Sequence, residues 1–263
     1  MNGWVLRRGF RVYEWLRSVE AKIGPSKREI PLNAAADGLA LPPAMLRMQV
    51  AGTADVAPFI QGGQLAAQTI RELLSAAGRP LNRCSAILDF GCGCGRVLRQ
   101  WKDEQEISWY GTDLNAELVA WCRQQLPFAS VSVNSLEPPT SFEDRRFEAI
   151  YAFSVFTHMP ADMQMRWLGE FKRILKPGGL LIFSTHGSYY APGLTRDARQ
   201  RFQDGQFVVR FESAAGSNLC STYHPEEFVR RELAQGWEIS AFVPEGARGN
   251  PRQDAWVFRR LHH

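Results

Sequence analysis

Residues 87–101 have the sequence ILDFGCGCGRVLRQW, in which three alternating glycines join an apolar run to a helical pattern. A short apolar run that ends in glycines is typical of a buried strand in a parallel sheet. Glycines let a ligand approach the backbone closely, and the free N–H groups at the start of a helix attract the polar part of a nucleotide-like ligand. The stretch therefore predicts a nucleotide-type site at the end of a strand in an α/β sheet.

Strands and helices alternate through the middle of the chain. The strand-like runs span 85–90, 107–112, 129–133, 147–153 and 180–185. The helical patterns between them span 95–103, about 115–125 and 162–175. This alternation predicts a doubly wound parallel sheet with helices on both faces.

The last part of the chain has a different order. A helical pattern over 226–234 is followed by two strand-like runs, 237–243 and 254–260, which a loop rich in proline, glycine and asparagine connects. Because no helix fits between these two runs, we expect them to pair as an antiparallel hairpin on the sheet.

An N-terminal helical extension is predicted over residues 1–60, ahead of an α/β domain over 61–263 that opens with a helix at 61–77. The first helix of the extension, about 4–21, mixes aromatic residues with arginines. That mixture is compatible with contact between residues 1–22 and an anionic membrane surface. We instead expect this helix to pack over the catalytic domain or, in a homodimer, against a second copy of the chain.

The segment 186–224 interrupts the alternation after the fifth strand-like run. Its patterns predict a short helix over 195–204 and a strand over 207–211, and it is rich in aromatic residues. We expect this insertion to act as a lid that contacts the substrate.

The composition indicates a globular protein from a reducing compartment. The chain has 263 residues, of which 45% are hydrophobic and 22% charged, enough to bury a sizeable core. Five cysteines, an odd number in a chain too large to depend on disulfides, indicate a cytoplasmic protein.

No apolar run approaches the ~20 residues of a membrane span. The net charge is only +4 and no Lys/Arg block stands out, so we expect no nucleic-acid partner.

The residues around the glycines narrow the choice of ligand. Dinucleotide folds use the pattern G-x-G-x-x-G, but Arg96 occupies the third glycine position here. Asp89 places a carboxylate where a pyrophosphate would be repelled and where an ammonium group would be attracted. Asp113 ends the second strand-like run, where an acidic side chain receives the hydroxyls of a ribose. A ligand with a ribose, a cationic portion and no diphosphate is S-adenosylmethionine.

With these residues, the sequence over about 61–260 resembles the class I S-adenosylmethionine-dependent methyltransferases. Five stretches carry the resemblance in order: ILDFGCGCGR, YGTDLNAELVAWC, VSVNSLEPP, FEAIYAFSVFTHMP and LGEFKRILKPGGLLIFSTHG. The resemblance implies a Rossmann-like, seven-stranded sheet of strand order 3-2-1-4-5-7-6 with strand 7 antiparallel. That arrangement is consistent with the expected terminal hairpin.

The resemblance also implies the cofactor site. Asp89 and the glycines would shape the methionine side, Asp113 would bind the ribose, and Leu114 would pack on the adenine. Many relatives carry Asp where this chain has Asn134, which still permits a contact with the adenine amino group. The full set of implied cofactor-binding residues is Asp89, Phe90, Gly91, Cys92, Gly93, Gly95, Arg96, Asp113, Leu114, Asn134, Ser135, Leu136, Phe153 and Ser154.

The pair Cys92 and Cys94 raises the alternative of a metal site. Two thiolates cannot complete a tetrahedral zinc site, and the cysteines at 84, 122 and 220 form no second pair. We therefore expect no metal and assign these cysteines to the structure or lining of the loop.

Histidines provide the candidate catalytic groups. Methyl transfer needs a base only if the acceptor must lose a proton, as an alcohol does. His158 follows the fourth strand-like run and His186 the fifth, so both are candidate bases, with capping or packing as the alternative role for His158. The candidate substrate contacts lie in the insertion: Tyr189, Tyr190, Tyr223 and His224, with a small aromatic core as the alternative.

These observations predict methyl transfer from S-adenosylmethionine to a small molecule, at the hydroxyl of a sugar, natural product or lipid-like acceptor. Enzymes that methylate amino groups of DNA bases or of protein glutamine carry an Asn/Asp-Pro-Pro-aromatic motif after the fourth strand. This chain has SVFT there, which disfavours those substrates. Three alternatives remain open: a methyltransferase of RNA or protein, another group transferase such as a polyamine synthase, and a non-catalytic S-adenosylmethionine-binding protein.

Overall fold

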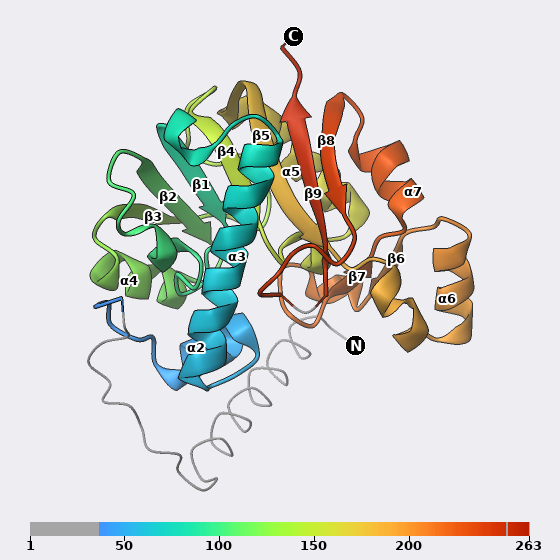
Figure 1. Cartoon of the computed structure of the whole chain (residues 1–263). Coiled ribbons are helices and arrows are strands. Elements are labelled where there is room, and N and C mark those ends of the chain that lie inside the picture. Colours follow the sequence, from blue (N-terminus) through green and yellow to red (C-terminus); the bar gives the residue numbers. More distant parts are fainter. Residues whose placement is uncertain (1–36, 251, 263) are drawn as a thin grey trace, which may run out of the picture.

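The computed structural model describes residues 37–250 and 252–262 (Figure 1). The basic helix expected at about 4–21 lies outside the described residues. The boundary expected between residues 60 and 61 falls inside one helix, α3 (Val56–Ala76). Within the described ranges, no helix combines the length and the apolar character that crossing a bilayer requires.

Seven strands form one mixed sheet in the order β3-β2-β1-β4-β5-β9-β8, which confirms the predicted topology. The strands are β1 (Ala86–Phe90), β2 (Ser108–Asp113), β3 (Ala129–Val133), β4 (Phe147–Ala152), β5 (Leu175–Thr185), β8 (Trp237–Val243) and β9 (Asp254–Arg260). The first five are parallel, and β9 pairs antiparallel with both β5 and β8. All residues of β1 and β4 are buried, because central strands of a parallel sheet are covered on both faces.

Helices cover the two faces of this sheet (Figure 1). Successive side chains of a strand point to opposite faces, so Ile87 packs with α3 and α4 (Ala116–Gln125). Leu88 instead packs with α5 (Ala161–Ile174) and with α7 (Glu226–Phe228), which continues as a π-helix to Leu233.

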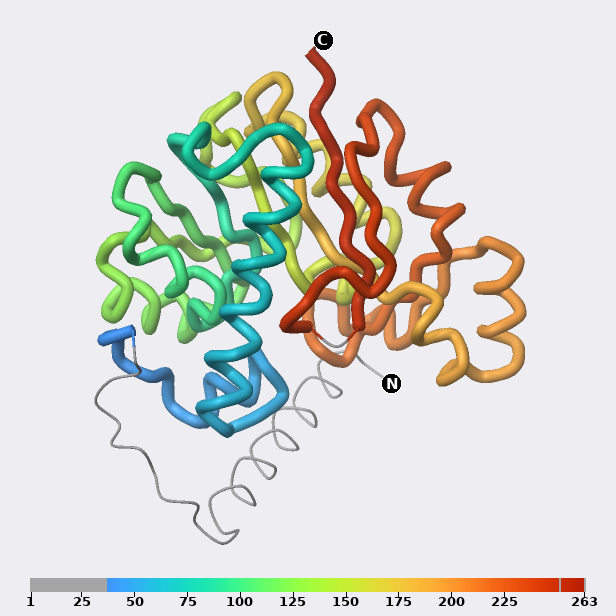
Figure 2. The backbone as a smooth tube through the Cα atoms, viewed as in Figure 1, coloured from blue at the N-terminus to red at the C-terminus, as the bar shows by residue number. Residues whose placement is uncertain are grey.

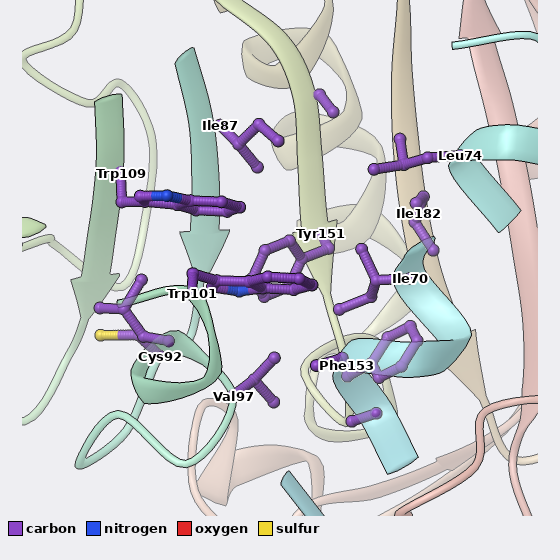
Figure 3. Close-up of a cluster of buried hydrophobic side chains, with 14 of the residues drawn as sticks. Ile70, Leu74, Ile87, Cys92, Val97, Trp101, Trp109, Tyr151, Phe153 and Ile182 are labelled. Atoms are coloured by element: carbon purple, nitrogen blue, oxygen red, sulfur yellow. The ribbon is translucent and has the colours of Figure 1, made fainter. Parts of the chain in front are cut away.

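Three aromatic residues, Trp101, Trp109 and Tyr151, lie in the same buried cluster as Cys92 of the glycine stretch (Figure 3). The rings of Trp101 and Trp109 stack with centroids 4.8 Å apart, and Trp101 Nε1 donates a hydrogen bond to the hydroxyl of Tyr151 at 2.9 Å. Both partners are buried, so this hydrogen bond satisfies polar groups that would otherwise be costly to bury.

The segment after the glycines differs from the prediction. We expected a helix over 95–103, but the structure has turns followed by a 3-10 helix at Leu98–Trp101. Two tertiary contacts hold this compact form. The backbone of α3 approaches so closely that a Cβ on Gly63 would lie 2.3 Å from the carbonyl oxygen of Arg96. The buried guanidinium of Arg99 donates to both carboxylate oxygens of Asp37, at 2.7 and 2.8 Å.

Several boundaries and short elements were also not predicted. β5 begins at Leu175, because the Lys-Pro-Gly-Gly stretch that ends α5 is already part of the strand. The helix α2 (Ala44–Ala51) precedes α3. In the insertion, α6 (Arg196–Gln203) agrees with the expected helix. β6 (Val208–Arg210) pairs with an unpredicted strand, β7 (Ser221–Tyr223).

Two helical glycines provide a matched test of the contact at Gly63. We expect Gly63→Ala to destabilise the fold by about 1–3 kcal/mol, since the new methyl group would overlap the Arg96 carbonyl. Gly169 is exposed in α5, with nothing within 4 Å of a Cβ, so Gly169→Ala should stabilise by about 0.5–1 kcal/mol. Urea unfolding measures both; stabilisation by both substitutions would contradict the close approach.

Candidate active site

A cavity of about 430 Å³ lies at the carboxyl ends of β1, β2 and β4, within the size range of small-ligand sites. The predicted cofactor residues that line it are Asp89, Phe90, Gly91, Cys92, Gly93, Arg96, Asp113, Leu114, Asn134, Leu136, Phe153 and Ser154. Gly95 and Ser135 are not among the lining residues. The candidate base His158 also lines the cavity.

The glycine loop is tied to β2. The N–H groups of Gly91 and Cys92 both donate to the carbonyl of Thr112, at 2.8 and 2.9 Å. Gly93 N–H donates to Asp113 Oδ2 at 2.9 Å. Gly91 has φ +79°, and a Cβ there would lie 2.4 Å from Val155. Only glycine meets both the conformational and the steric requirement at this position.

Asp113 is well placed to bind two hydroxyls. Besides Gly93 N–H, its carboxylate accepts the N–H of Asn115 at 2.8 Å, so both oxygens have fixed positions. Burial raises the pKa of this carboxyl, and the backbone N–H donors partly offset that effect. A carboxylate oxygen has more than one lone pair, so each can still accept a ribose hydroxyl.

Asp89 fits a cationic group. The side chain is only 4% exposed, and its Oδ2 has no hydrogen-bond partner in the part of the chain that the structure describes. Burial raises the pKa of Asp89 to about 8, although a hydrogen bond from Tyr151 and the nearby Arg96 oppose the shift. A buried acid with an unused acceptor in a cavity wall matches the ammonium group of S-adenosylmethionine.

Asn134 fits the adenine end in the same way. Its Nδ2 donates to the carbonyl of Ser135 at 2.8 Å, whereas its buried Oδ1 has no partner among the described residues. That oxygen can accept a hydrogen bond from the amino group of adenine. The cavity wall beside it contains Leu114 and Leu136, which supply apolar contacts for a base.

Part of the site was missed by the sequence analysis. Gln49 and Val50 of α2 line the cavity, as do residues 216–218 of the insertion. Asn218 Nδ2 donates to the carbonyl of Gln49 at 2.9 Å, so the two segments meet over the cavity. Neither segment carries a family motif. Tyr151 was also missed, although it pairs with Asp89 across the neighbouring strands, so the β4 pattern could have identified it.

His158 faces the cavity with one nitrogen fixed. Its Nδ1 lies 2.7 Å from the carbonyl oxygen of Cys220. A carbonyl only accepts hydrogen bonds, so Nδ1 carries the proton and Nε2 keeps its lone pair. Burial lowers the pKa of His158, and the bond to Cys220 only partly opposes the shift. The imidazole is therefore neutral at pH 7.

The other predicted residues lie outside the cavity lining. His186 Nδ1 donates to the carbonyl of Thr222 at 3.1 Å, and burial lowers the pKa of His186 to about 4. Its ring packs 4.2 Å from that of Tyr190 and 5.5 Å from that of Tyr223. Tyr189 is half exposed and lies against Tyr190.

The side chain of His224 is more deeply buried than that of His186. It is 1% exposed and packs against Phe207, and its Nε2 contacts the side-chain amide of Gln164 at 2.9 Å. These surroundings are those of a core histidine. A substrate role for His224 and the three tyrosines remains a prediction.

The five cysteines are buried free thiols. Cys122 Sγ lies 3.3 Å from the carbonyl of Gly93, beneath the glycine loop. Among the described residues, no group of three or more His, Cys, Asp or Glu side chains is placed to hold a metal ion.

The pKa of Asp89 generates a proton-linkage prediction. In the empty site the carboxyl holds its proton below about pH 8, and pairing with an ammonium favours the carboxylate. Binding of S-adenosylhomocysteine at pH 6.5 should therefore release close to one proton. Calorimetry in buffers of different ionisation enthalpy measures the release.

Two variants define the source of that proton. Asp89→Asn should abolish the release and weaken binding, whereas Asn134→Ala should weaken binding and leave the release intact. Equal binding heats in all buffers for the unsubstituted protein would contradict the assignment.

Comparison with known proteins agrees with this geometry. Residues 87–179 match the family model of a methyltransferase domain. The tRNA N(3)-methylcytidine methyltransferase Mettl2 of Drosophila melanogaster is 25% identical over 162 residues, which cover 57% of this chain and 47% of Mettl2. The malonyl-[acyl-carrier protein] O-methyltransferase of Enterobacter lignolyticus is 27% identical over 164 residues, or 59% of this chain and 60% of that protein. The chain thus spans about half to three-fifths of these relatives.

A solved structure shows the same fold. The glycopeptide N-methyltransferase MtfA, crystallised with S-adenosylmethionine, superposes with a TM-score of 0.51 at 15% identity, covering 73% of this chain and 93% of MtfA. The strand order, the glycine loop fixed to Asp113, and the matched methyltransferase domain lead to one conclusion. The chain contains a methyltransferase domain with the class I, S-adenosylmethionine-dependent fold, and S-adenosylmethionine is the cofactor of that domain.

Proposed function

We propose that this protein methylates a hydroxyl group of a small-molecule acceptor and that His158 is the general base. The observation that carries the proposal is the state of the His158 ring. Its Nδ1–H is held by the Cys220 carbonyl, while Nε2 is unpaired among the described residues and belongs to a side chain that lines the cavity. A neutral imidazole with a free nitrogen at a ligand cavity has the properties of a general base.

The chemistry requires little more than alignment and one proton acceptor. S-adenosylmethionine, when bound, supplies a methyl group on a positively charged sulfur. His158 Nε2 would accept the hydroxyl proton while the acceptor oxygen takes the methyl group, and the methyl–sulfur bond would break to leave neutral S-adenosylhomocysteine. Asp89, Asp113 and Asn134 hold the cofactor at its ammonium, ribose and adenine. Fixed positions for both reactants contribute much of the acceleration of such a displacement.

A small acceptor is supported by the covering of the cavity. The Asn218–Gln49 hydrogen bond joins the insertion to α2 above the cofactor residues. The aromatic rings of Tyr190, Tyr223 and His186 lie within 4.2 to 6.4 Å of one another and would suit a ring or sugar acceptor. The malonyl-[acyl-carrier protein] relative is named for O-methylation, which agrees with an acceptor oxygen. Mettl2 is named for a tRNA substrate, so an RNA acceptor is an outcome that the test must detect.

Substitution of His158 tests the proposal. We expect His158→Asn to lower kcat by ~100-fold or more, as loss of a general base does, with S-adenosylhomocysteine affinity unchanged. His262 is an exposed histidine outside the cavity, so His262→Asn is the matched control. The assay measures S-adenosylhomocysteine formed with panels of phenols, sugars, hydroxylated lipids, transfer RNA and protein.

The pH profile gives a second readout. The base must be neutral, and burial lowers its pKa, so the acid limb of kcat/KM should lie below pH 6.5. Full activity in His158→Asn would exclude this base. Turnover confined to transfer RNA would replace the small acceptor by a macromolecule, and binding without turnover on any acceptor would favour a non-catalytic protein.

A further inference from the structure

The strand β7 contacts both candidate histidines through its backbone. The carbonyl of Cys220, directly before β7, accepts from His158 Nδ1, and the carbonyl of Thr222 accepts from His186 Nδ1. Two residues further on, His224 N–H donates to the carbonyl of His186 at 2.8 Å. Alternate residues of one extended segment therefore hold both rings.

Thr222 also fixes this segment to the turn that carries His158. Its hydroxyl donates to the carbonyl of Phe156 at 2.8 Å, and Phe156 begins the 3-10 helix Phe156–His158. Thr222 is fully buried, so no water competes for this hydrogen bond. On the other side, Thr222 pairs with Val209 in the small sheet β6-β7. The hydroxyl is thus a direct side-chain link between the insertion and the His158 turn.

We propose that Thr222 is a positioning residue, whose hydroxyl keeps β7 aligned so that both histidines carry their proton on Nδ1 and present Nε2 as an acceptor. Only the expected effect on kcat rests on the proposed function, in which His158 is the general base. The tautomers themselves follow from the carbonyl contacts. The insertion then does more than cover the acceptor, because it sets the protonation pattern of the base.

The direct test is nuclear magnetic resonance of the full chain with ¹⁵N-labelled histidine, using His158→Asn and His186→Asn to assign the rings. In the unsubstituted protein we expect both rings as the Nδ1–H tautomer between pH 7 and 8. An Nε2–H tautomer for either ring would overturn the inference without reference to methyl transfer, and this measurement needs no Thr222 variant.

Variants then test the role of the hydroxyl. Thr222→Val keeps the shape but removes the donor, so we expect mixed tautomers for both rings and a fall of ~10-fold or more in kcat with KM for S-adenosylmethionine unchanged. Thr222→Ser should restore the wild-type signals and kcat. Thr69→Val, which removes another buried and hydrogen-bonded hydroxyl, should change neither.

The outcomes separate the two proposals. Altered tautomers in Thr222→Val with unchanged kcat would support the positioning role and count against His158 as the base. Wild-type tautomers in Thr222→Val would overturn the positioning role, whatever the activity. A Thr222→Ser variant that behaves like Thr222→Val would assign the effect to packing of the methyl group and likewise overturn it.

Discussion

The hydrogen bond from Gly93 N–H to the Asp113 carboxylate joins the two strand ends on which the site depends. It holds the glycine loop against β2, and it orients the carboxylate that is to receive the ribose. The bond is partly buried and satisfies both its donor and its acceptor, so it stabilises the loop in this position. Asp89 and Asn134 differ in this respect, since each retains an acceptor oxygen that only a ligand would satisfy.

Patterns along the chain were sufficient to predict the strands of the parallel sheet, because central parallel strands are continuous apolar runs and each is followed by a helix or turn. The strand order followed from the family resemblance. The hairpin of β8 and β9 followed from the absence of a helix between two runs. The 3-10 helix at Leu98–Trp101 could not be predicted, because the backbone of α3 and the Arg99–Asp37 pair determine it. The run at 207–211 predicted β6, but its partner β7 has only three residues and is too short for a periodicity to stand out.

The residues of the candidate site also fall into two groups: those that sequence motifs predict and those that only the folded chain brings together. Residues of the glycine loop and the strand ends lie within recognisable motifs, and most of them line the cavity. Gln49 and Asn218 reach it from segments without a motif, so only the folded chain brings them together. From the sequence alone, His158 and His186 were both candidates for the general base. Only His158 lines the cavity. The carbonyls that select the tautomer of each ring belong to Cys220, directly before β7, and to Thr222 within it, about sixty residues after His158.

The guanidinium of Arg96 donates to the carbonyl of Gly249, 153 residues later in the chain, and Gly62 of α3 packs against the same glycine. Figure 2 shows the loop between β8 and β9 beside α3. A ribosome therefore finishes the glycine loop long before it makes the residues that enclose Arg96. At about 5–20 residues per second, that interval lasts on the order of ten to thirty seconds. During synthesis the earlier strands can form, but Arg96, which lines the cavity, gains its partners Gly249 and Asn250 only after the loop between β8 and β9 emerges. If Arg96 needs these partners to hold its place in the cavity wall, cofactor binding favours chains that already contain this loop over shorter intermediates.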